Sequence, residues 1–177
     1  MAILGGKTPC NTYRELINCM DVQTSSRQVI IVGGGRVGRR TAAQLSESGY
    51  MVTVIERDET KRERIVGHTV SRVVVGDGTD IECFKKANPT MAEVVAALTN
   101  DTETNLAVCE LARELVPGVR TLARICEDGE QDYAHLGSVD NIVYPAAAGA
   151  ALAADRITMD RPGVVQTMGV PEDRSTE

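Results

Sequence analysis

Apolar residues occur in short continuous runs from Gln28 onward, and each run is followed by a stretch in which apolar residues recur at helical spacing. Continuous apolar runs of about four to eight residues are typical of strands that are buried on both faces. The pattern predicts strands at residues 28–32, 51–56, 71–75, 94–98, 120–125 and 141–144. It predicts helices at residues 36–48, 58–66, 80–87, 101–115 (with Asp101 as N-cap), 129–136 and 145–159.

This alternation of strands and helices is typical of βαβ units. We therefore predict an α/β fold, namely a Rossmann-like doubly wound parallel sheet of six strands with helices on both faces. Right-handed crossovers give such a sheet the strand order 3-2-1-4-5-6. Ligands bind such sheets outside the carboxyl ends of the strands, at the switch point between strands one and four.

The alternating pattern also predicts the domain boundaries. We expect one nucleotide-binding domain at residues 27–160. Residues 1–26 contain glycines, a proline and a polar run around one short amphipathic stretch, which predicts an N-terminal extension. Residues 161–177 have the composition of a C-terminal tail.

Composition and charge argue against some classes of function. The 177 residues are 42% hydrophobic, with a net charge of −6 and a pI near 5.0. An acidic chain with 3% aromatic residues argues against binding to nucleic acid, which needs clustered cations and stacking platforms. The sequence shows neither an apolar run of membrane-spanning length nor a signal peptide pattern. We expect a cytoplasmic protein that reaches the inner face of the cell membrane only through a partner.

The cysteines and histidines offer no metal or catalytic pattern. None of the five cysteines forms a C-x-x-C pair, and neither His68 nor His135 adjoins a cysteine or an acidic cluster. We expect buried free thiols, with a redox-sensing role for Cys126 as an alternative. No metal ligand and no catalytic residue is predicted.

A glycine-rich turn follows the first predicted strand. Gly33, Gly35 and Gly38 fit the pattern G-x-G-x-x-G, in which the first glycine allows the tight turn. The second lets the backbone approach a pyrophosphate, and the third lets the helix pack closely. The loop also contains Gly34, Arg36 and Val37, with Arg36 able to reach a phosphate or to remain solvated. A helix N-terminus here would bind an anion.

The second strand strengthens this interpretation because it ends in Glu56, at about the twenty-residue spacing of the dinucleotide fingerprint. A carboxylate there can accept hydrogen bonds from the ribose hydroxyls of adenosine and would repel a 2′-phosphate. The alternative is an ordinary acidic strand end. We therefore expect NAD(H) or ATP/ADP as the ligand.

Polar residues at the ends of the other strands should reach the same crevice. They are Asp77 with Thr79, Thr99 with Asn100, and Arg124. Thr99 and Asn100 offer donors at the switch point, and the Arg124 guanidinium suits bidentate phosphate contact. The alternatives are a simple turn at Asp77 and an ion pair of Arg124 with Glu127 or Asp128.

Together these motifs resemble the RCK or KTN nucleotide-binding domain (TrkA N-terminal type) of Trk and Ktr potassium transport regulators. The resemblance covers about residues 28–157. It rests on the acid Glu56 and on five motifs. The motifs are V-G-G-G-R-V-G (ending at Gly38), G-D-G-T (ending at Thr79), T-N-D-T-E-T-N (ending at Asn105), L-A-R (ending at Arg124) and V-D-N-I-V-Y-P (ending at Pro145).

The resemblance implies a regulatory subunit that binds NAD(H), ATP or ADP and gates a membrane potassium channel or transporter. It also implies a homo-oligomer: a dimer through the Rossmann lobes that can assemble into a ring. Calcium-gated relatives carry acidic residues where this chain has residues 122–126, so no calcium site is expected. The smaller C-terminal lobe of full-length members does not fit into residues 161–177.

Two other functions fit the sequence less well. One is an NAD-dependent dehydrogenase domain of the siroheme-synthesis type, which also opens with a glycine turn but needs a substrate pocket from a second domain or a partner. The other is a detached regulatory domain of a potassium efflux antiporter. Because no catalytic group accompanies the nucleotide motifs, we predict a binding module and not an enzyme.

Overall fold

The computed structural model describes residues 27–66, 70–126 and 137–158. The strands are β1 (Gln28–Val32), β2 (Met51–Glu56), β3 (Arg72–Val75), β4 (Ala92–Ala97), β5 (Arg120–Arg124) and β6 (Asn141–Val143). The helices are α2 (Arg36–Glu47), α3 (Arg62–Val66), α4 (Ile81–Lys85), α5 (Thr102–Leu115) and α6 (Pro145–Thr158), with 3-10 turns η1 (Glu59–Lys61) and η2 (Pro89–Met91).

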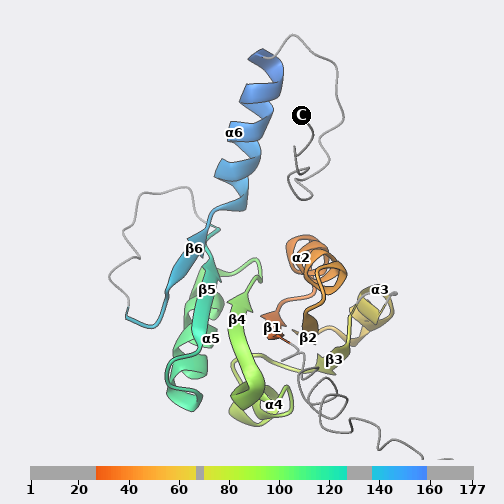
Figure 1. Cartoon of the computed structure of the whole chain (residues 1–177), viewed down its shortest axis with the longest axis vertical. Helices are drawn as coiled ribbons and strands as arrows, with labels where there is room; N and C mark the ends of the chain where they lie inside the picture. Colours follow the sequence, from red (N-terminus) through yellow and green to blue (C-terminus); the bar gives the residue numbers. More distant parts are fainter. Residues whose placement is uncertain (1–26, 67–69, 127–136, 159–177) are drawn as a thin grey trace, which may run out of the picture. The chain divides into compact units, whose positions relative to one another are not determined.

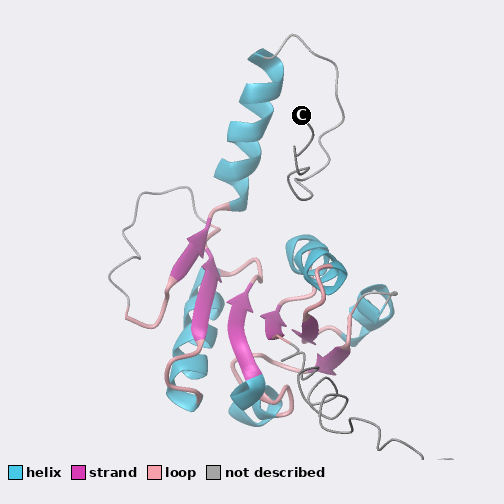
Figure 2. Cartoon of the chain, viewed as in Figure 1, coloured by secondary structure: helices cyan, strands magenta, loops and turns pink. Residues whose placement is uncertain are grey.

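The strands form one parallel sheet in the order β3-β2-β1-β4-β5-β6 (Figure 2). The predicted doubly wound topology is therefore confirmed. Val32 at the end of β1 lies in register with Ile55 of β2 and with Ala97 of β4. The carboxyl ends of β2, β1 and β4 consequently lie at the same edge of the sheet. The direction in which successive strands are added to the sheet reverses between β1 and β4.

Helices cover both faces of the sheet (Figure 1). On one face, Ala42 of α2 and Ile65 of α3 pack with the central strand residues Val52 and Val54. On the other face, Phe84 of α4 and Val108 of α5 belong to the second buried cluster. Because both faces are covered, the strands need the continuous apolar character that the sequence shows.

The observed boundaries differ from the predicted ones by a few residues. Asp80 is the N-cap of α4, since its side chain accepts a hydrogen bond from the Cys83 N–H at 2.7 Å, so the helix begins at Ile81. β4 begins at Ala92, where the pairing with β1 shifts register. The segment predicted as one helix at residues 58–66 divides into η1 and α3. The helix predicted at residues 129–136 lies outside the described residues.

The chain divides into two compact units after Val143. In the second unit, α6 has no buried residue, and Leu152 and Ile157 are exposed. Among the residues that the structure describes, no helix is long and apolar enough to span a bilayer.

Two cysteines of the first unit confirm the expectation of buried free thiols. Cys83 and Cys109 are free and buried. Cys109 of α5 is fully buried, and this burial raises the pKa of its thiol to about 12. The folded state therefore holds the Cys109 proton at alkaline pH, where the unfolded chain releases it.

This difference predicts an alkaline loss of stability that Cys109→Ala removes. Because the pKa is higher in the folded state, the Cys109 contribution is constant below about pH 9 and falls by about 1.4 kcal/mol per pH unit above it, until the folded pKa is reached. Urea denaturation of both proteins under reducing conditions, from about pH 8 to about pH 10.5, measures the effect. A difference in unfolding free energy that stays constant over this range would contradict the prediction.

Candidate functional site

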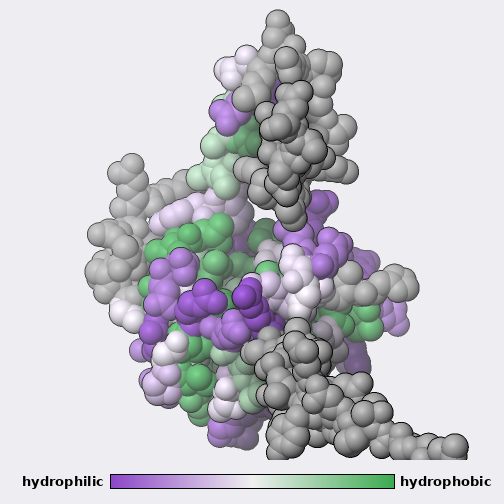
Figure 3. Space-filling model, viewed as in Figure 1, coloured by the Kyte–Doolittle hydropathy of each residue, from purple (hydrophilic) through white to green (hydrophobic). Residues whose placement is uncertain are grey.

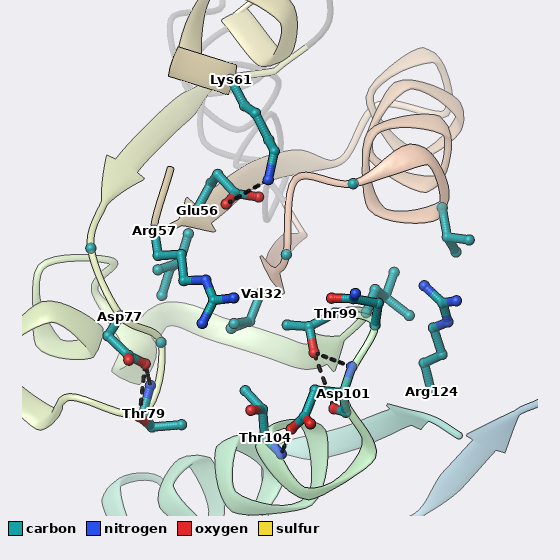
Figure 4. A pocket seen from close by; sticks show the side chains of 18 of the residues that line it. Val32, Glu56, Arg57, Lys61, Asp77, Thr79, Thr99, Asp101, Thr104 and Arg124 are labelled. Carbon is teal, nitrogen blue, oxygen red and sulfur yellow. Dashed lines mark hydrogen bonds and ion pairs between the residues drawn. The ribbon is translucent and has the colours of Figure 1, made fainter. Parts of the chain in front are cut away.

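A pocket of about 510 Å³ lies at the carboxyl edge of the sheet, across the switch point between β1 and β4 (Figure 4). Its size falls in the range of small-molecule and cofactor sites. The lining comes from the carboxyl ends of β1, β2 and β5 and from the segments that follow β1, β2, β3 and β4. It consists of Val32, Gly33, Gly35, Arg36, Val37, Ile55, Glu56, Arg57, Lys61, Gly76, Asp77, Gly78, Thr79, Leu98, Thr99, Asn100, Asp101, Thr104 and Arg124.

All the predicted site residues except Gly34 and Gly38 line this pocket. Sequence reasoning missed Arg57, Lys61 and Thr104, and it assigned Asp101 only as a helix cap. In Figure 3, strongly hydrophilic residues gather across the middle of the visible face, around the end of β4. The convergence of strand-end residues expected from the topology is thus present.

The three motif glycines occupy three different environments. Gly33 has a positive φ of 103°, and its N–H donates to the Ile55 carbonyl at 2.9 Å. A side chain on Gly38 would collide with the Gly33 carbonyl oxygen, so this glycine lets α2 approach the turn. A Cβ at Gly35 would meet nothing within 4 Å. The space beside Gly35 is therefore open to a ligand that approaches the backbone.

The amino end of α2 faces the pocket without a capping side chain. Its N-cap is Gly35, and no side chain accepts a hydrogen bond there. The first intrahelical bond at this end runs from the Arg39 N–H to the Gly35 carbonyl at 3.0 Å. The preceding N–H groups of the helix, including those of the pocket residues Arg36 and Val37, have no helical acceptor. These groups and the helix dipole create an anion-binding position.

Glu56 holds the glycine turn in place. Its side chain is only 7% exposed, and Oε2 accepts a hydrogen bond from the Gly34 N–H at 2.7 Å. Oε1 accepts one from the Asp58 N–H at 3.0 Å and lies 3.5 Å from the Lys61 ammonium. Both oxygens of the carboxylate therefore already accept hydrogen bonds from the protein, which the strand pattern alone did not reveal.

A buried amide ties the ends of β4 and β5 together. Asn105 of α5 is fully buried, and its Oδ1 accepts hydrogen bonds from the Thr99 N–H at 3.0 Å and the Thr99 hydroxyl at 2.8 Å. Its Nδ2 donates to the Arg124 carbonyl at 2.7 Å. Thr102 reinforces the connection, since its hydroxyl oxygen accepts the Cys126 N–H at 2.9 Å.

Asn105 was not among the predicted site residues. A signal was present, because Asn105 lies on the same helical stripe as the buried residues Cys109 and Ala112. A polar amide on an apolar stripe requires internal hydrogen-bond partners. Thr99 directs its N–H and hydroxyl at Asn105, and Thr99 and Asn100 both line the pocket. Their contribution to ligand binding stays a prediction.

Two aspartates form turns at the pocket wall. Asp77 Oδ1 accepts the Thr79 N–H at 2.8 Å and the Thr79 hydroxyl at 2.7 Å, and these bonds lower the pKa of Asp77. Hydrogen bonds from Thr104 likewise lower the pKa of Asp101, the N-cap of α5. Both carboxylates are thus ionised at neutral pH, and both threonine hydroxyls line the same pocket.

Arg124 provides a positive charge at the end of β5. Its side chain lines the pocket, and its Nε is buried without a hydrogen-bond partner in the described part of the chain. The ion pairs considered with Glu127 and Asp128 lie outside the described residues. A buried donor without a partner is costly, so this atom is suited to an acceptor supplied by a ligand.

The described residues do not form a metal centre. Within residues 27–66, 70–126 and 137–158, no group of three or more His, Cys, Asp or Glu side chains is placed to hold a metal ion. Cys126 lies beside the pocket wall, with its Sγ 3.8 Å from the Thr99 carbonyl oxygen. The pocket offers cationic, carboxylate, hydroxyl and backbone N–H groups.

Comparison with known proteins agrees with this geometry. The family model of the TrkA-N domain matches residues 29–145. A Trk system potassium uptake protein TrkA homolog of Methanothermobacter thermautotrophicus is 37% identical over 119 residues, which cover 66% of this chain and 54% of the relative. The chain spans about half the length of the curated relatives that it matches first.

Solved structures show the same fold. The TrkA-N domain of the inner membrane protein ybaL from Escherichia coli superposes with a TM-score of 0.66 at 22% identity, covering 75% of this chain and 97% of that domain. GsuK bound to ADP superposes with a TM-score of 0.62 at 28% identity, covering 77% of this chain and 35% of that one. The resemblance to RCK-type domains is confirmed, and the chain belongs to the TrkA-N domain family.

Proposed function

We propose that this chain is a nucleotide-sensing regulatory domain of a potassium channel or uptake system. It binds an adenine nucleotide, NAD(H) or ATP/ADP, in the pocket at the switch point and carries out no chemistry of its own. It acts at the inner face of the membrane through a membrane-embedded partner, and it functions as a homo-oligomer.

One observation supports nucleotide binding above the others: two anion-binding features converge on the same pocket. The uncapped N-terminus of α2 at Gly35 is one, and Arg124, with its unpartnered buried Nε, is the other. A pyrophosphate carries acceptors for both. Two separate groups of donors suit an extended, doubly charged group better than a single small anion.

Glu56 defines the adenosine side of the pocket. A carboxylate has about four acceptor directions, and Gly34, Asp58 and Lys61 occupy three of them. The remaining direction suffices for a ribose hydroxyl. In this proposal the ligand contacts the same carboxylate that holds the glycine turn, so ribose binding and loop position are coupled.

A regulatory role agrees with the composition of the pocket. Its lining, which comes entirely from the described residues, contains no His, Cys, Ser or Tyr, and its acids Glu56, Asp77 and Asp101 accept hydrogen bonds from backbone N–H groups of the chain itself. The relatives named Trk system potassium uptake protein support a role in potassium transport. A nucleotide regulates such a partner only if it binds two arrangements of the assembly with different affinity.

We predict that Gly35→Ala weakens nucleotide binding with little effect on folding. The new methyl group has open space around it and an ordinary φ of −68°, but it occupies the approach of the phosphates to α2. Isothermal titration with NAD⁺, NADH, ATP and ADP should show affinity lower by about tenfold or more, equivalent to about 1.4 kcal/mol. Loss of the glycine cap should cost at most about 1 kcal/mol of stability.

Gly137→Ala is the matched control, because the same methyl group at Gly137 also meets nothing within 4 Å and lies outside the pocket lining. This variant should bind like the wild type. Absence of binding of all four nucleotides to the wild-type protein would refute the proposed function. Equal affinity of the wild type and Gly35→Ala would remove the α2 N-terminus from the binding site.

We also predict that Arg124→Gln lowers nucleotide affinity by about 10-fold to 100-fold. The loss corresponds to hydrogen bonds to a charged group, worth about 1.5–3 kcal/mol. The control is Arg120→Gln, which removes the same charge from the other end of β5, where Arg120 is 65% exposed and 3.8 Å from Glu93. If both substitutions weaken binding equally, the effect is one of net charge and not of a contact by Arg124.

A further inference from the structure

Arg57 is a pocket residue that the nucleotide motifs leave unassigned. It directly follows Glu56, the last residue of β2, and is exposed. Figure 4 shows its side chain extending from the β2 end into the pocket, on the Asp77 side, whereas Arg124 lies on the far side of Thr99. Within the described residues, Arg57 makes no hydrogen bond or ion pair. Its guanidinium is thus available to a ligand.

The surroundings of Arg57 do not suit a phosphate. Asp77 and Asp101 are both ionised, chiefly because of hydrogen bonds from Thr79 and Thr104 respectively, and the charge of Arg57 lowers both pKa values further. A phosphate drawn to Arg57 would be repelled by these two carboxylates. A neutral group would not be repelled. The phosphate-binding features, the α2 N-terminus and Arg124, lie elsewhere in the pocket.

The part of the pocket lining next to Arg57, the Gly76–Gly78 wall, contains two glycines. Gly76 and Gly78 both line the pocket, and a side chain on either would collide with Cys83 or Val32. The apolar residues Val32 and Ile55 also belong to the pocket lining. A lining of glycines and apolar side chains beside a planar cation is suited to a flat aromatic ring.

We propose that Arg57 is the base-binding residue of the pocket, with its guanidinium stacked on the adenine ring against the Gly76–Gly78 wall. The inference rests on the proposed nucleotide-binding function and identifies the residue that distinguishes a nucleotide from a sugar phosphate. Guanidinium groups stack on aromatic faces and on nucleic acid bases because they are planar, delocalised and weakly hydrated. A lysine ammonium at this position would carry the same charge but has no planar group that can stack on a ring.

The experiment compares Arg57→Ala and Arg57→Lys with the wild-type protein by isothermal titration with ADP. Stacking predicts that both variants lose about tenfold in ADP affinity, because lysine does not restore the planar contact. Restoration of wild-type affinity in Arg57→Lys would show a charge contact and overturn the proposal. Wild-type affinity in Arg57→Ala would overturn it as well.

A second comparison uses AMP and ribose 5-phosphate, which share the phosphate and the sugar and differ in the base. Arg57→Ala should lower the affinity for AMP, and it should leave unchanged the ability of ribose 5-phosphate to displace ADP. An equal loss for both ligands would place Arg57 on the phosphate and overturn the proposal. Arg62→Ala, an exposed arginine of α3 outside the pocket lining, is the control and should bind AMP as the wild type does.

The two proposals fail in different ways. If the wild-type chain binds no adenine nucleotide, the proposed function fails and the role of Arg57 fails with it. If the wild-type chain binds ADP and depends on Arg124 but not on Arg57, only the assignment of the base contact fails.

Discussion

The hydrogen bond from the Gly34 N–H to the buried Glu56 carboxylate is the contact on which the pocket depends. A glycine turn is flexible in isolation, and here an acid on the adjacent strand holds it through a hydrogen bond of 2.7 Å, beside the bond from the Gly33 N–H to the Ile55 carbonyl. On the other side of the switch point, Asn105 fixes the ends of β4 and β5 in a similar way. Two buried polar side chains, one from a strand and one from a helix, thus connect the segments on either side of the crevice.

The charges of the pocket are separated in space and not merely balanced. Arg36 and Arg124 accompany the α2 N-terminus and the end of β5, whereas Asp77 and Asp101 lie with Arg57. Such a distribution orients a ligand that is anionic at one end and neutral at the other. It also agrees with an adenine nucleotide better than with an inorganic anion, which has no neutral end to place.

Much of this arrangement could be predicted from the sequence, because it follows from the spacing of apolar residues along the chain and from the topology rules of parallel sheets. Continuous apolar runs and glycine spacing led to the sheet order and to most of the pocket lining. The long-range partners of Glu56 and the bridging role of Asn105 could not be predicted. They depend on which atoms meet across elements, and neither residue type nor spacing encodes that. Arg57 and Lys61 were missed because a charge after a strand is usually solvated.

The pairing of β1 with β4 links the pocket to the folding of the chain. Val29 lies beside Val94, so the two strands that border the crevice come from distant parts of the sequence, and β2 and β3 are placed between them in the chain. Contacts of such high sequence separation are slow to form, because a long loop must close first. The crevice therefore exists only after β1 and β4 have paired. A nascent chain that ends before β4 lacks one border of the crevice and so has no binding site. A nucleotide bound in the crevice would contact the segments that follow both strands, and it would therefore stabilise their pairing and slow the unfolding of the domain.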